Sequence, residues 1–350
     1  MNIRTIDWLN NKVRLIDQTK LPQKLVYIDI DNPRDLWQAI KIMQVRGAPA
    51  LGAAAALGVY LGIKDYTGKD PKGFWRKLEK TAKYIASSRP TARNLFWGIE
   101  RVCLAAKKNR KKVIFKIKQA ILYEAKKIMQ EDMVSCRLIG AYGAKLLKNN
   151  SSVLTICNAG ILATIDYGTA LGVIYSAKEQ GKKINVFSSE TRPLLQGARL
   201  ATWELHKKGI DVVMIADNTA AALMQDGAID IIITGADRIA ANGDAVNKIG
   251  TLNLAILAKY HNIPFYIAAP QSTFDLKVNC GRNIKIEMRK ASEVAKILLI
   301  KDTAPIGAKV WNPAFDITPH QLISGIITDR GIIRGPFLKN INKVLKGGRS

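Results

Sequence analysis

The chain has 350 residues, of which 48% are hydrophobic and 23% charged, and its formal net charge is +26. At about 150 residues per domain, this length favours two domains, and the apolar content excludes a chain that is disordered throughout. The positive excess predicts attraction for phosphates, nucleic acid or anionic surfaces. Four scattered cysteines without a CxxC pair exclude a disulfide scaffold and are typical of a reducing compartment.

Two further features predict a cytoplasmic protein with no membrane partner. The first residues, MNIRTIDWLNNKVRLIDQ, lack the apolar core of a signal peptide. The longest apolar stretch, residues 48–63, is shorter than the ~18–20 residues that a membrane span needs, and it is rich in alanine and glycine.

The N-terminal part of the chain predicts an α+β domain, residues 1–130. Residues 1–36 alternate apolar and polar side chains and read as short strands. Helical spacing follows from residue 34 to about 87, with interruptions at Gly47 and residues 67–73, and a further helix is expected after residue 91 to about 108. An amphipathic stretch around residues 113–122, with lysines on its other face, predicts a long helix that bridges two domains.

The second half predicts a mostly parallel sheet, in a domain of residues 131–350. From about residue 151, short apolar runs alternate with helical stretches; the runs are VLTI, INVF, DVVMIA, DIIIT and PFYIAA. This β–α alternation favours an α/β fold with helices on both faces of the sheet.

Polar residues follow most of these runs at the point where each strand should end. They are Cys157, Glu190, Arg192, Asp217 and Asp237. Ligands of open parallel sheets bind outside the carboxyl ends of the strands, so we expect these side chains to line one rim. Any single one is better explained as a cap of the next helix, but five together favour a site.

Cys157 and Asp237 are the strongest catalytic candidates. A cysteine between a strand and a small-residue turn into a helix meets the positive end of that helix, which favours the thiolate; the alternative is a buried structural cysteine. After Asp237, the turn at residues 242–244 should deliver Asn247 and Lys248 to the start of another helix, where an anion can bind. The alternative there is an ordinary turn with a surface lysine.

The segment RGAPALGAAAALGVY offers a second anion site. Arg46, Gly47 and Ala48 can hold a phosphate through the guanidinium and main-chain amides; a small-residue helix packed on a neighbour explains the stretch equally well. Arg89, in a loop before a proline, is a weaker candidate of the same kind. The three histidines lack metal-ligand spacing, and no GxGxxG or GxxxxGK[ST] motif follows a strand, so we expect neither a metal nor a nucleotide cofactor.

Several motifs, in this order, together resemble those of the methylthioribose-1-phosphate isomerase family over residues 40–335. The motifs are RGAPALGAAAALGVY, RPTARNLFWGIERV, TICNAGILATIDYGTALGVI, SETRPLLQGARLATWEL, TGADRIAANGDAVNKIGTLNLA, IPFYIAAPQSTFD and NPAFDITPHQLISGIITDRG. The wider superfamily includes ribose-1,5-bisphosphate isomerases and regulatory subunits of a translation initiation exchange factor.

The resemblance implies conversion of 5-methylthioribose 1-phosphate to 5-methylthioribulose 1-phosphate, a step of methionine salvage. It implies a small N-terminal α+β domain followed by a Rossmann-like, mostly parallel sheet domain, a homodimer, and no metal or nucleotide. By the motif match, Cys157 and Asp237 correspond to the catalytic pair. The implied substrate-binding positions are Arg46, Gly47, Ala48, Arg89, Gln196, Asn247 and Lys248.

The chemistry of such a substrate accounts for these residue types. Because the anomeric oxygen carries phosphate, the ring cannot open as a free hemiacetal, and an acid must protonate the ring oxygen. Asp237, kept protonated in a water-poor pocket, is the expected acid. Cys157 either acts as the base through an enediol or stabilises the transition state of a hydride shift, and the sequence leaves both routes open.

Two other functions remain as alternatives. A ribose-1,5-bisphosphate isomerase would need added cations around C5, whereas a methylthio group needs an apolar wall. A non-catalytic regulatory subunit is disfavoured because both Cys157 and Asp237 are retained. No specific nucleic-acid partner is expected, because aromatic residues do not interleave with the lysines.

Overall fold

The computed structural model describes residues 3–68, 70–297, 301–305 and 307–346, and its contacts divide the chain into two compact units. Unit 1 comprises Met1–Ser135 and Ile161–Gly168, and unit 2 comprises Cys136–Gly160 and Thr169–Ser350. The first crossing from unit 1 to unit 2 falls inside one long helix, α5 (Ile114–Ala144).

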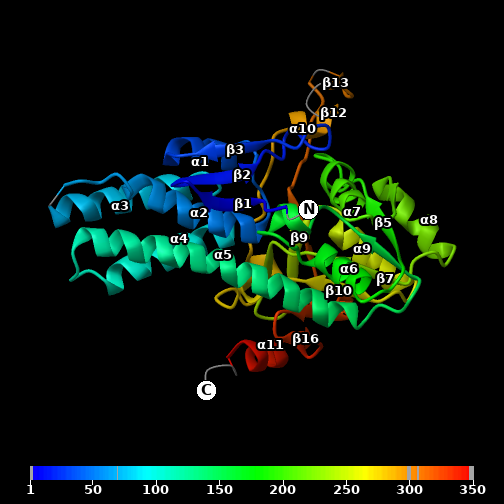
Figure 1. Cartoon of the computed structure of the whole chain (residues 1–350). Helices are drawn as coiled ribbons and strands as arrows, with labels where there is room; N and C mark the ends of the chain where they lie inside the picture. The colour runs from blue at the N-terminus through cyan, green and yellow to red at the C-terminus, as the bar shows by residue number, and fades with distance from the viewer. Residues whose placement is uncertain (1–2, 69, 298–300, 306, 347–350) are drawn as a thin grey trace. The chain divides into compact units, whose positions relative to one another are not determined.

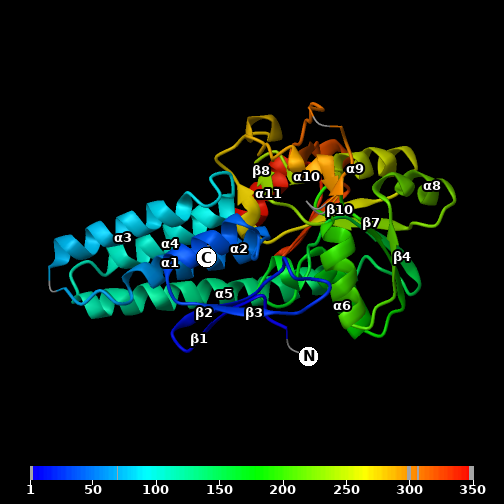
Figure 2. The same cartoon turned by 90° about the horizontal axis from the view of Figure 1, so that it is seen from above.

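Unit 1 combines a three-stranded antiparallel sheet with helices that lie alongside one another (Figures 1 and 2). The sheet has the order β1 (Ile6–Leu9), β2 (Lys12–Ile16), β3 (Tyr27–Ile30). The helices before α5 are α1 (Pro33–Lys41), α2 (Ala48–Ile63), α3 (Pro71–Ala86) and α4 (Arg93–Lys108). These elements confirm the strands expected in residues 1–36 and the helix expected from about 91 to 108.

Helix α2 forms the centre of the unit 1 core. Twelve of its sixteen residues are buried, so it is covered on nearly every side rather than along one stripe. Its small side chains permit this: a Cβ added to Gly98 of α4 would lie 2.1 Å from the carbonyl oxygen of Gly52. The alanine-rich stretch therefore serves close helix packing, as the structural alternative for this segment predicts.

Unit 2 is built on a seven-stranded sheet in the order β16-β15-β10-β7-β4-β5-β6. All neighbouring strands from β15 to β6 are parallel, and only the edge strand β16 is antiparallel. The strands are β4 (Ser151–Thr155), β5 (Ile184–Ser189), β6 (Val212–Ile215), β7 (Ile231–Thr234), β10 (Phe265–Ala268), β15 (Gly325–Thr328) and β16 (Gly331–Ile333). The five expected apolar runs are thus confirmed as parallel strands.

Helices α6 to α9 accompany these strands (Figure 1). They are α6 (Ala170–Glu179), α7 (Thr202–Lys207), α8 (Ala220–Gln225) and α9 (Thr251–Tyr260), and α11 (Phe337–Lys346) follows the last strand. All residues of β7 and β10 are buried, as expected for inner strands of a covered parallel sheet. The expected α/β class, with a Rossmann-like domain after an α+β segment, is confirmed.

The strand order reverses between β4 and β7. From β4 the chain adds β5 and then β6 on one side, and afterwards it adds β7, β10 and β15 on the other. In open α/β sheets this reversal creates a crevice at the carboxyl ends of the two central strands, where ligands bind. The fold itself therefore marks the loops after β4 and β7 as the place for a site.

A smaller four-stranded sheet in unit 2 is absent from the sequence-based expectation. Its order is β11 (Phe274–Asp275), β8 (Arg238–Ala240), β9 (Ala245–Lys248), β14 (Phe315–Thr318). Residues 238–248 thus form a β-hairpin where only a turn was expected. The chain between β11 and β14 contains α10 (Ser292–Ala295) and the short pair β12 (Lys296–Ile297) and β13 (Lys301–Asp302).

Candidate active site

Cys157 lies two residues beyond β4, on one side of the crevice. Its backbone has φ 63°, its amide donates to Thr191 Oγ1 at 2.8 Å, and its side chain belongs to the buried part of unit 2. Positive φ is uncommon outside glycine, and such strained positions cluster at functional sites. The loop therefore holds the thiol in one defined position.

Cys157 was expected to precede a small-residue turn into a helix, but that turn leads only to the short 3₁₀-helix η1 (Ile161–Ala163). The chain first enters unit 1 with residues Ile161–Gly168, and α6 begins only at Ala170. The turn after Cys157 is fixed instead by Glu204, which is 1% exposed and accepts hydrogen bonds from Asn158 Nδ2 at 2.8 Å and Tyr175 Oη at 2.9 Å. Sequence reasoning missed Glu204, because its partners lie 46 and 29 residues away.

The loop after β5, residues 190–196, is called the β5 loop. The Asp217 carboxylate accepts hydrogen bonds from the amides of Thr191 at 2.8 Å and Arg192 at 2.6 Å, and from the Ser189 hydroxyl. Asp217 was expected on the rim as a site residue. Its two oxygens instead anchor the β5 loop, and through Thr191 they support Cys157.

Gln196 ends the β5 loop and precedes a π-helical turn, η2 (Gly197–Ala201). Its side chain is 5% exposed, and its Oε1 has no hydrogen-bond partner among the described residues. π-Turns are frequent at functional sites, and a buried amide oxygen without a partner calls for an explanation such as a ligand or a water. The geometry is therefore compatible with the substrate contact expected for Gln196.

Asp237 lies on the other side of the crevice, three residues after β7. It is half-buried, and its amide donates to the carbonyl oxygen of Val246 at 2.9 Å, which ties it to β9. A Cβ added to Gly235 would lie 2.9 Å from the Cβ of Ala159, so the loops after β7 and β4 touch. The structure thus brings the Cys157 and Asp237 loops together.

Strand β9 ends with Asn247 and Lys248. Asn247 is buried, and its Nδ2 lies 3.0 Å from Thr251 Oγ1, at the start of α9. Lys248 Nζ donates to the Ala314 carbonyl oxygen at 2.8 Å and lies 4.6 Å from the Phe315 ring centroid. A cation over an aromatic face is attracted by the ring quadrupole, so β14 fixes the position of the lysine head group.

The start of α9 is already occupied by a carboxylate of the protein. Asp316 Oδ2 accepts a hydrogen bond from the Gly250 amide at 2.7 Å. Burial raises the pKa of Asp316 to about 6, although the amides of Leu252 and Gly250 and the nearby Lys248 oppose this effect. The anion seat expected here is therefore filled by Asp316. The sequence did not reveal this, because Asp316 lies 66 residues after Gly250 and reaches it through the pairing of β14 with β9.

The other expected binding residues belong to unit 1. Arg46 is buried, with its Nε 3.2 Å from Gln18 Oε1, and Gly47 caps the N-terminus of α2 with φ 93°. A Cβ at Gly47 would lie 2.4 Å from the backbone of Ala163, so only glycine fits. Ala48 opens α2 beyond this turn, where helix amides favour an anion. Arg89 is half-buried in the loop between α3 and α4.

The expected site residues thus fall into two groups. Unit 2 holds Cys157, Gln196, Asp237, Asn247 and Lys248, and unit 1 holds Arg46, Gly47, Ala48 and Arg89.

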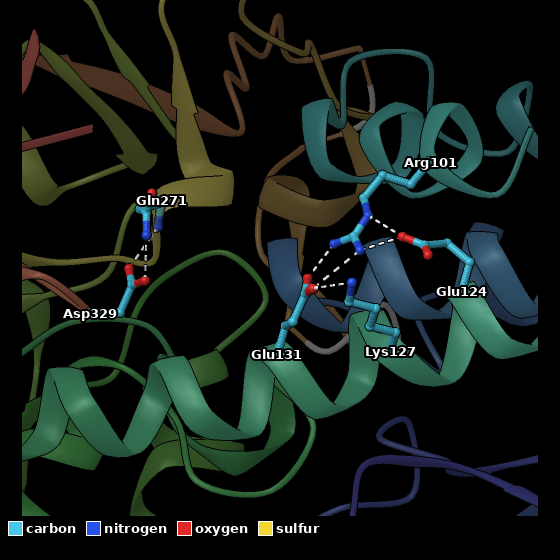
Figure 3. Close-up of polar contacts among 6 residues, drawn as sticks. All are labelled: Arg101, Glu124, Lys127, Glu131, Gln271 and Asp329. Carbon is cyan, nitrogen blue, oxygen red and sulfur yellow. Dashed lines mark hydrogen bonds and ion pairs between the residues drawn. The ribbon is translucent and has the colours of Figure 1, made fainter. Parts of the chain in front are cut away.

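Polar groups elsewhere are engaged in structural pairs (Figure 3). After β10, the amide and Nε2 of Gln271 donate to Asp329 at 3.0 and 2.7 Å, which closes the loops after β10 and β15 on each other. In unit 1, Arg101 of α4 bridges Glu124 and Glu131 of α5. Within the described ranges, no cluster of three or more metal-ligating side chains occurs, and no helix is both long and apolar enough to cross a membrane.

The fold defines an α/β protein whose sheet has a switch point between β4 and β7, the place where open α/β sheets bind small molecules. Comparison with known families narrows this class. The model of the Initiation factor 2 subunit family matches residues 44–335, and the chain belongs to that family.

Similar proteins of the family carry two kinds of name. A 5-deoxyribose 1-phosphate isomerase from Moorella thermoacetica is 52% identical over 345 residues, 99% of this chain and 98% of that protein. A methylthioribose-1-phosphate isomerase from Geotalea uraniireducens is 49% identical over 345 residues, 99% of each.

Two similar solved structures carry the names of an isomerase and of a translation factor subunit. The crystal structure of 5-methylthioribose 1-phosphate isomerase from Pyrococcus horikoshii has a TM-score of 0.91 and 42% identity, covering 99% of this chain and 96% of that one. A structure from A. fulgidus described as translation initiation factor eIF-2B, subunit delta, has a TM-score of 0.87 and 47% identity, covering 98% and 99%.

Proposed function

We propose that this protein is a sugar-phosphate isomerase that converts 5-methylthioribose 1-phosphate into 5-methylthioribulose 1-phosphate, with 5-deoxyribose 1-phosphate as a related substrate. The observation that carries the proposal is the placement of Cys157 and Asp237 after the two strands at which the strand order reverses. The names of relatives about 50% identical over nearly the whole chain support the same class of reaction.

The proposed first step is ring opening. Asp237, as the carboxylic acid, gives its proton to the ring oxygen, and the bond between that oxygen and C1 breaks. The electron deficiency left at C1 is shared with the ester oxygen of the phosphate. A half-buried position that limits water favours such proton transfer at a defined atom.

The second step moves one hydrogen from C2 to C1. Along the enediol route, the Cys157 thiolate takes the proton from C2 and returns it to C1, while the O2 hydroxyl gives its proton to the Asp237 carboxylate and becomes the ketone. Along the hydride route, hydrogen passes with its electron pair from C2 to C1, Cys157 borders the transferring atom, and the O2 hydroxyl again gives its proton to the Asp237 carboxylate. Both routes end in the same ketose phosphate, with all atoms conserved.

Phosphate binding is the proposed task of the cationic and main-chain groups. In unit 2, Lys248 offers an ammonium held by β14. Separately, in unit 1, the predicted anion-binding groups are the Arg46 guanidinium and the amides at the start of α2. Asn247 and Gln196 are the proposed hydrogen-bonding partners of the sugar. The protein is further proposed to act as a cytoplasmic homodimer in methionine salvage.

The test is an NMR assay of the purified protein with three substrates in parallel. We expect ketose to appear from 5-methylthioribose 1-phosphate and 5-deoxyribose 1-phosphate. Turnover of ribose 1,5-bisphosphate instead would keep the catalytic pair but change the substrate. A folded sample that turns over none of the three would favour a regulatory subunit, such as the one named for the A. fulgidus structure.

A further inference from the structure

A pocket of about 230 Å³ lies in unit 2 outside the residues assigned so far. One wall comes from the β5 loop, one from Ile249 after β9, and the third from the chain between β11 and β14. The lining residues are Arg192 and Pro193, then Ile249, and then Val294, Trp311, Asn312 and Pro313.

Two of these walls are next in sequence to residues that contact the Cys157 loop. Arg192 follows Thr191, whose hydroxyl accepts the Cys157 amide at 2.8 Å. Ile249 precedes Gly250, and a Cβ added to Gly250 would lie 3.0 Å from Ile156 Cδ1, one residue before the thiol. The pocket therefore opens beside the Cys157 loop rather than at a remote surface.

The lining is mainly apolar, and its one cation is engaged. Arg192 donates through Nη2 to the Val294 carbonyl oxygen at 2.9 Å and through Nη1 to that of Pro193 at 3.2 Å. These bonds join the β5 loop to the segment that carries Val294. Arg192 thus acts as a tether that shapes the pocket.

The surroundings of the pocket also disfavour a second phosphate. Glu293 is buried next to Val294, and its Oε2 lies 3.5 Å from Asn312 Nδ2. Arg289, the nearby cation, is held by Glu293 and by Glu287, whose Oε1 is 3.0 Å away. Among the described lining residues, Arg192 is the one cation, and its Nη1 and Nη2 already donate to carbonyl oxygens, so a dianion placed here would lose water without a second cation to pair with.

From these observations we infer that the pocket receives the apolar substituent at C5 of the substrate, and that Val294 and Trp311 determine specificity there. This inference rests on the proposed function and deepens it. Because a water molecule takes about 30 Å³ of liquid volume, the pocket has room for a methylthio group with part of the sugar. A 5-deoxy sugar, whose C5 is itself the terminal methyl group, has no such substituent and leaves the pocket largely empty.

The expected consequence is a graded preference. An apolar pocket distinguishes substrates that differ by about one methylene by roughly 10–200-fold. We expect kcat/KM for 5-methylthioribose 1-phosphate to exceed that for 5-deoxyribose 1-phosphate about tenfold. Ribose 1,5-bisphosphate should be the poorest of the three substrates.

Two variants and a matched control test the assignment with the full-length protein. Trp311→Ala removes a ring that is 79% exposed, so the fold should tolerate it. Tyr260→Ala removes another exposed ring, at the end of α9 away from Ile249. We expect Trp311→Ala to lower kcat/KM for the methylthio sugar about tenfold and to leave the 5-deoxy sugar nearly unchanged. Tyr260→Ala should change neither.

The second variant adds a cation at the pocket wall. Val294→Lys should lower kcat/KM for the methylthio sugar and raise it for ribose 1,5-bisphosphate. Equal changes for all sugars in both pocket variants, or a wild-type preference for the bisphosphate, would overturn the assignment while the isomerase activity stands. Absence of turnover by the wild type would overturn the proposed function, and the pocket assignment with it.

Discussion

The loops after β5 and β9 are each held by a carboxylate, but the two carboxylates differ in how fully their oxygens are hydrogen-bonded. In each loop, a carboxylate from a distant strand or turn accepts backbone amides: Asp217 for the β5 loop and Asp316 for the start of α9. Asp217 uses both oxygens, on two amides and a hydroxyl. Asp316 uses Oδ2, whereas Oδ1 is buried without a hydrogen-bond partner among the described residues.

Because of this difference, Asp316 is the anchor that we expect to be sensitive to pH. The Asp217 carboxylate is stabilised by charge-assisted hydrogen bonds, and the loop it holds supports Cys157. The carboxylate of Asp316 is desolvated, and its pKa rises to about 6. It lies beside Lys248, so the β9 side of the crevice should respond to pH.

The largest expected effect concerns Asp237 and Cys157, the two proposed catalytic residues. Asp237→Asn and Cys157→Ser should each lower kcat by about 10²–10⁴-fold, because general acid–base groups contribute that much. The NMR assay with 5-methylthioribose 1-phosphate measures this. Circular dichroism confirms that each variant is folded, and full activity of either variant would remove that residue from the mechanism.

Removal of the β5 anchor should affect stability and activity together. Asp217→Ala leaves two amides and a hydroxyl without their charged acceptor, and hydrogen bonds to charged groups contribute about 1.5–3 kcal/mol each. Because Asp217 is only half-buried and water can replace part of these bonds, we expect a smaller total loss of about 3 kcal/mol in unfolding free energy, measured by urea unfolding, and a lower kcat because the Cys157 loop loosens. The exposed Asp226→Ala serves as the control. A stable variant with normal kcat would show that Thr191 does not depend on Asp217.

The β9 anchor makes a prediction about pH. The pKa of Asp316 is raised from 3.8 to about 6, so the folded state binds its proton more tightly than the unfolded chain does. Its contribution to stability is therefore fully present below pH 3.8 and is lost as pH rises through about 6.

Asp316→Asn removes this dependence. Between pH 4.5 and 7, the wild type should lose about 2 kcal/mol more unfolding free energy than the variant, since each pKa unit corresponds to about 1.4 kcal/mol. Urea unfolding at both pH values measures the difference. Asp226→Asn, an exposed carboxylate on the same unit, should keep the wild-type dependence; parallel curves for wild type and Asp316→Asn would contradict the assignment.

The same contrast explains how far the sequence could predict the molecule. The strands and helices with local periodicity, such as β4 to β7 and α4, were predictable because burial imposes periods of 2 or 3.6 residues. The crevice was predictable because Cys157 and Asp237 each follow an apolar run directly. Local sequence patterns were therefore sufficient for the elements that neighbouring residues determine.

The anchors were not predictable, because their causes are not local. Glu204 and Asp316 act through partners 46 and 66 residues away, and β14 becomes a strand only by pairing with β9. The α-helix after the Cys157 turn begins only at Ala170 for a similar, non-local reason, because residues 161–168 pack in unit 1. The spacing of residues in the sequence does not indicate such tertiary contacts. The sequence therefore predicted an anion site at the start of α9 without indicating that Asp316 accepts the Gly250 amide there.

The smallest expected effect concerns Arg101, which is outside both loops, and its variant serves as a reference for the Asp217 variant. Arg101 in unit 1 bridges Glu124 and Glu131 (Figure 3). Its guanidinium also lies 5.0 Å from the centroid of the Trp97 ring. It is partly exposed, so its ion pairs are screened, and Arg101→Met should cost only about 1 kcal/mol of unfolding free energy. The loss should shrink in about 1 M salt, where the Debye length falls to about 3 Å, and kcat should stay at the wild-type value. A drop in kcat as large as that of Asp217→Ala would mean that general destabilisation, rather than the β5 loop, explains the latter variant.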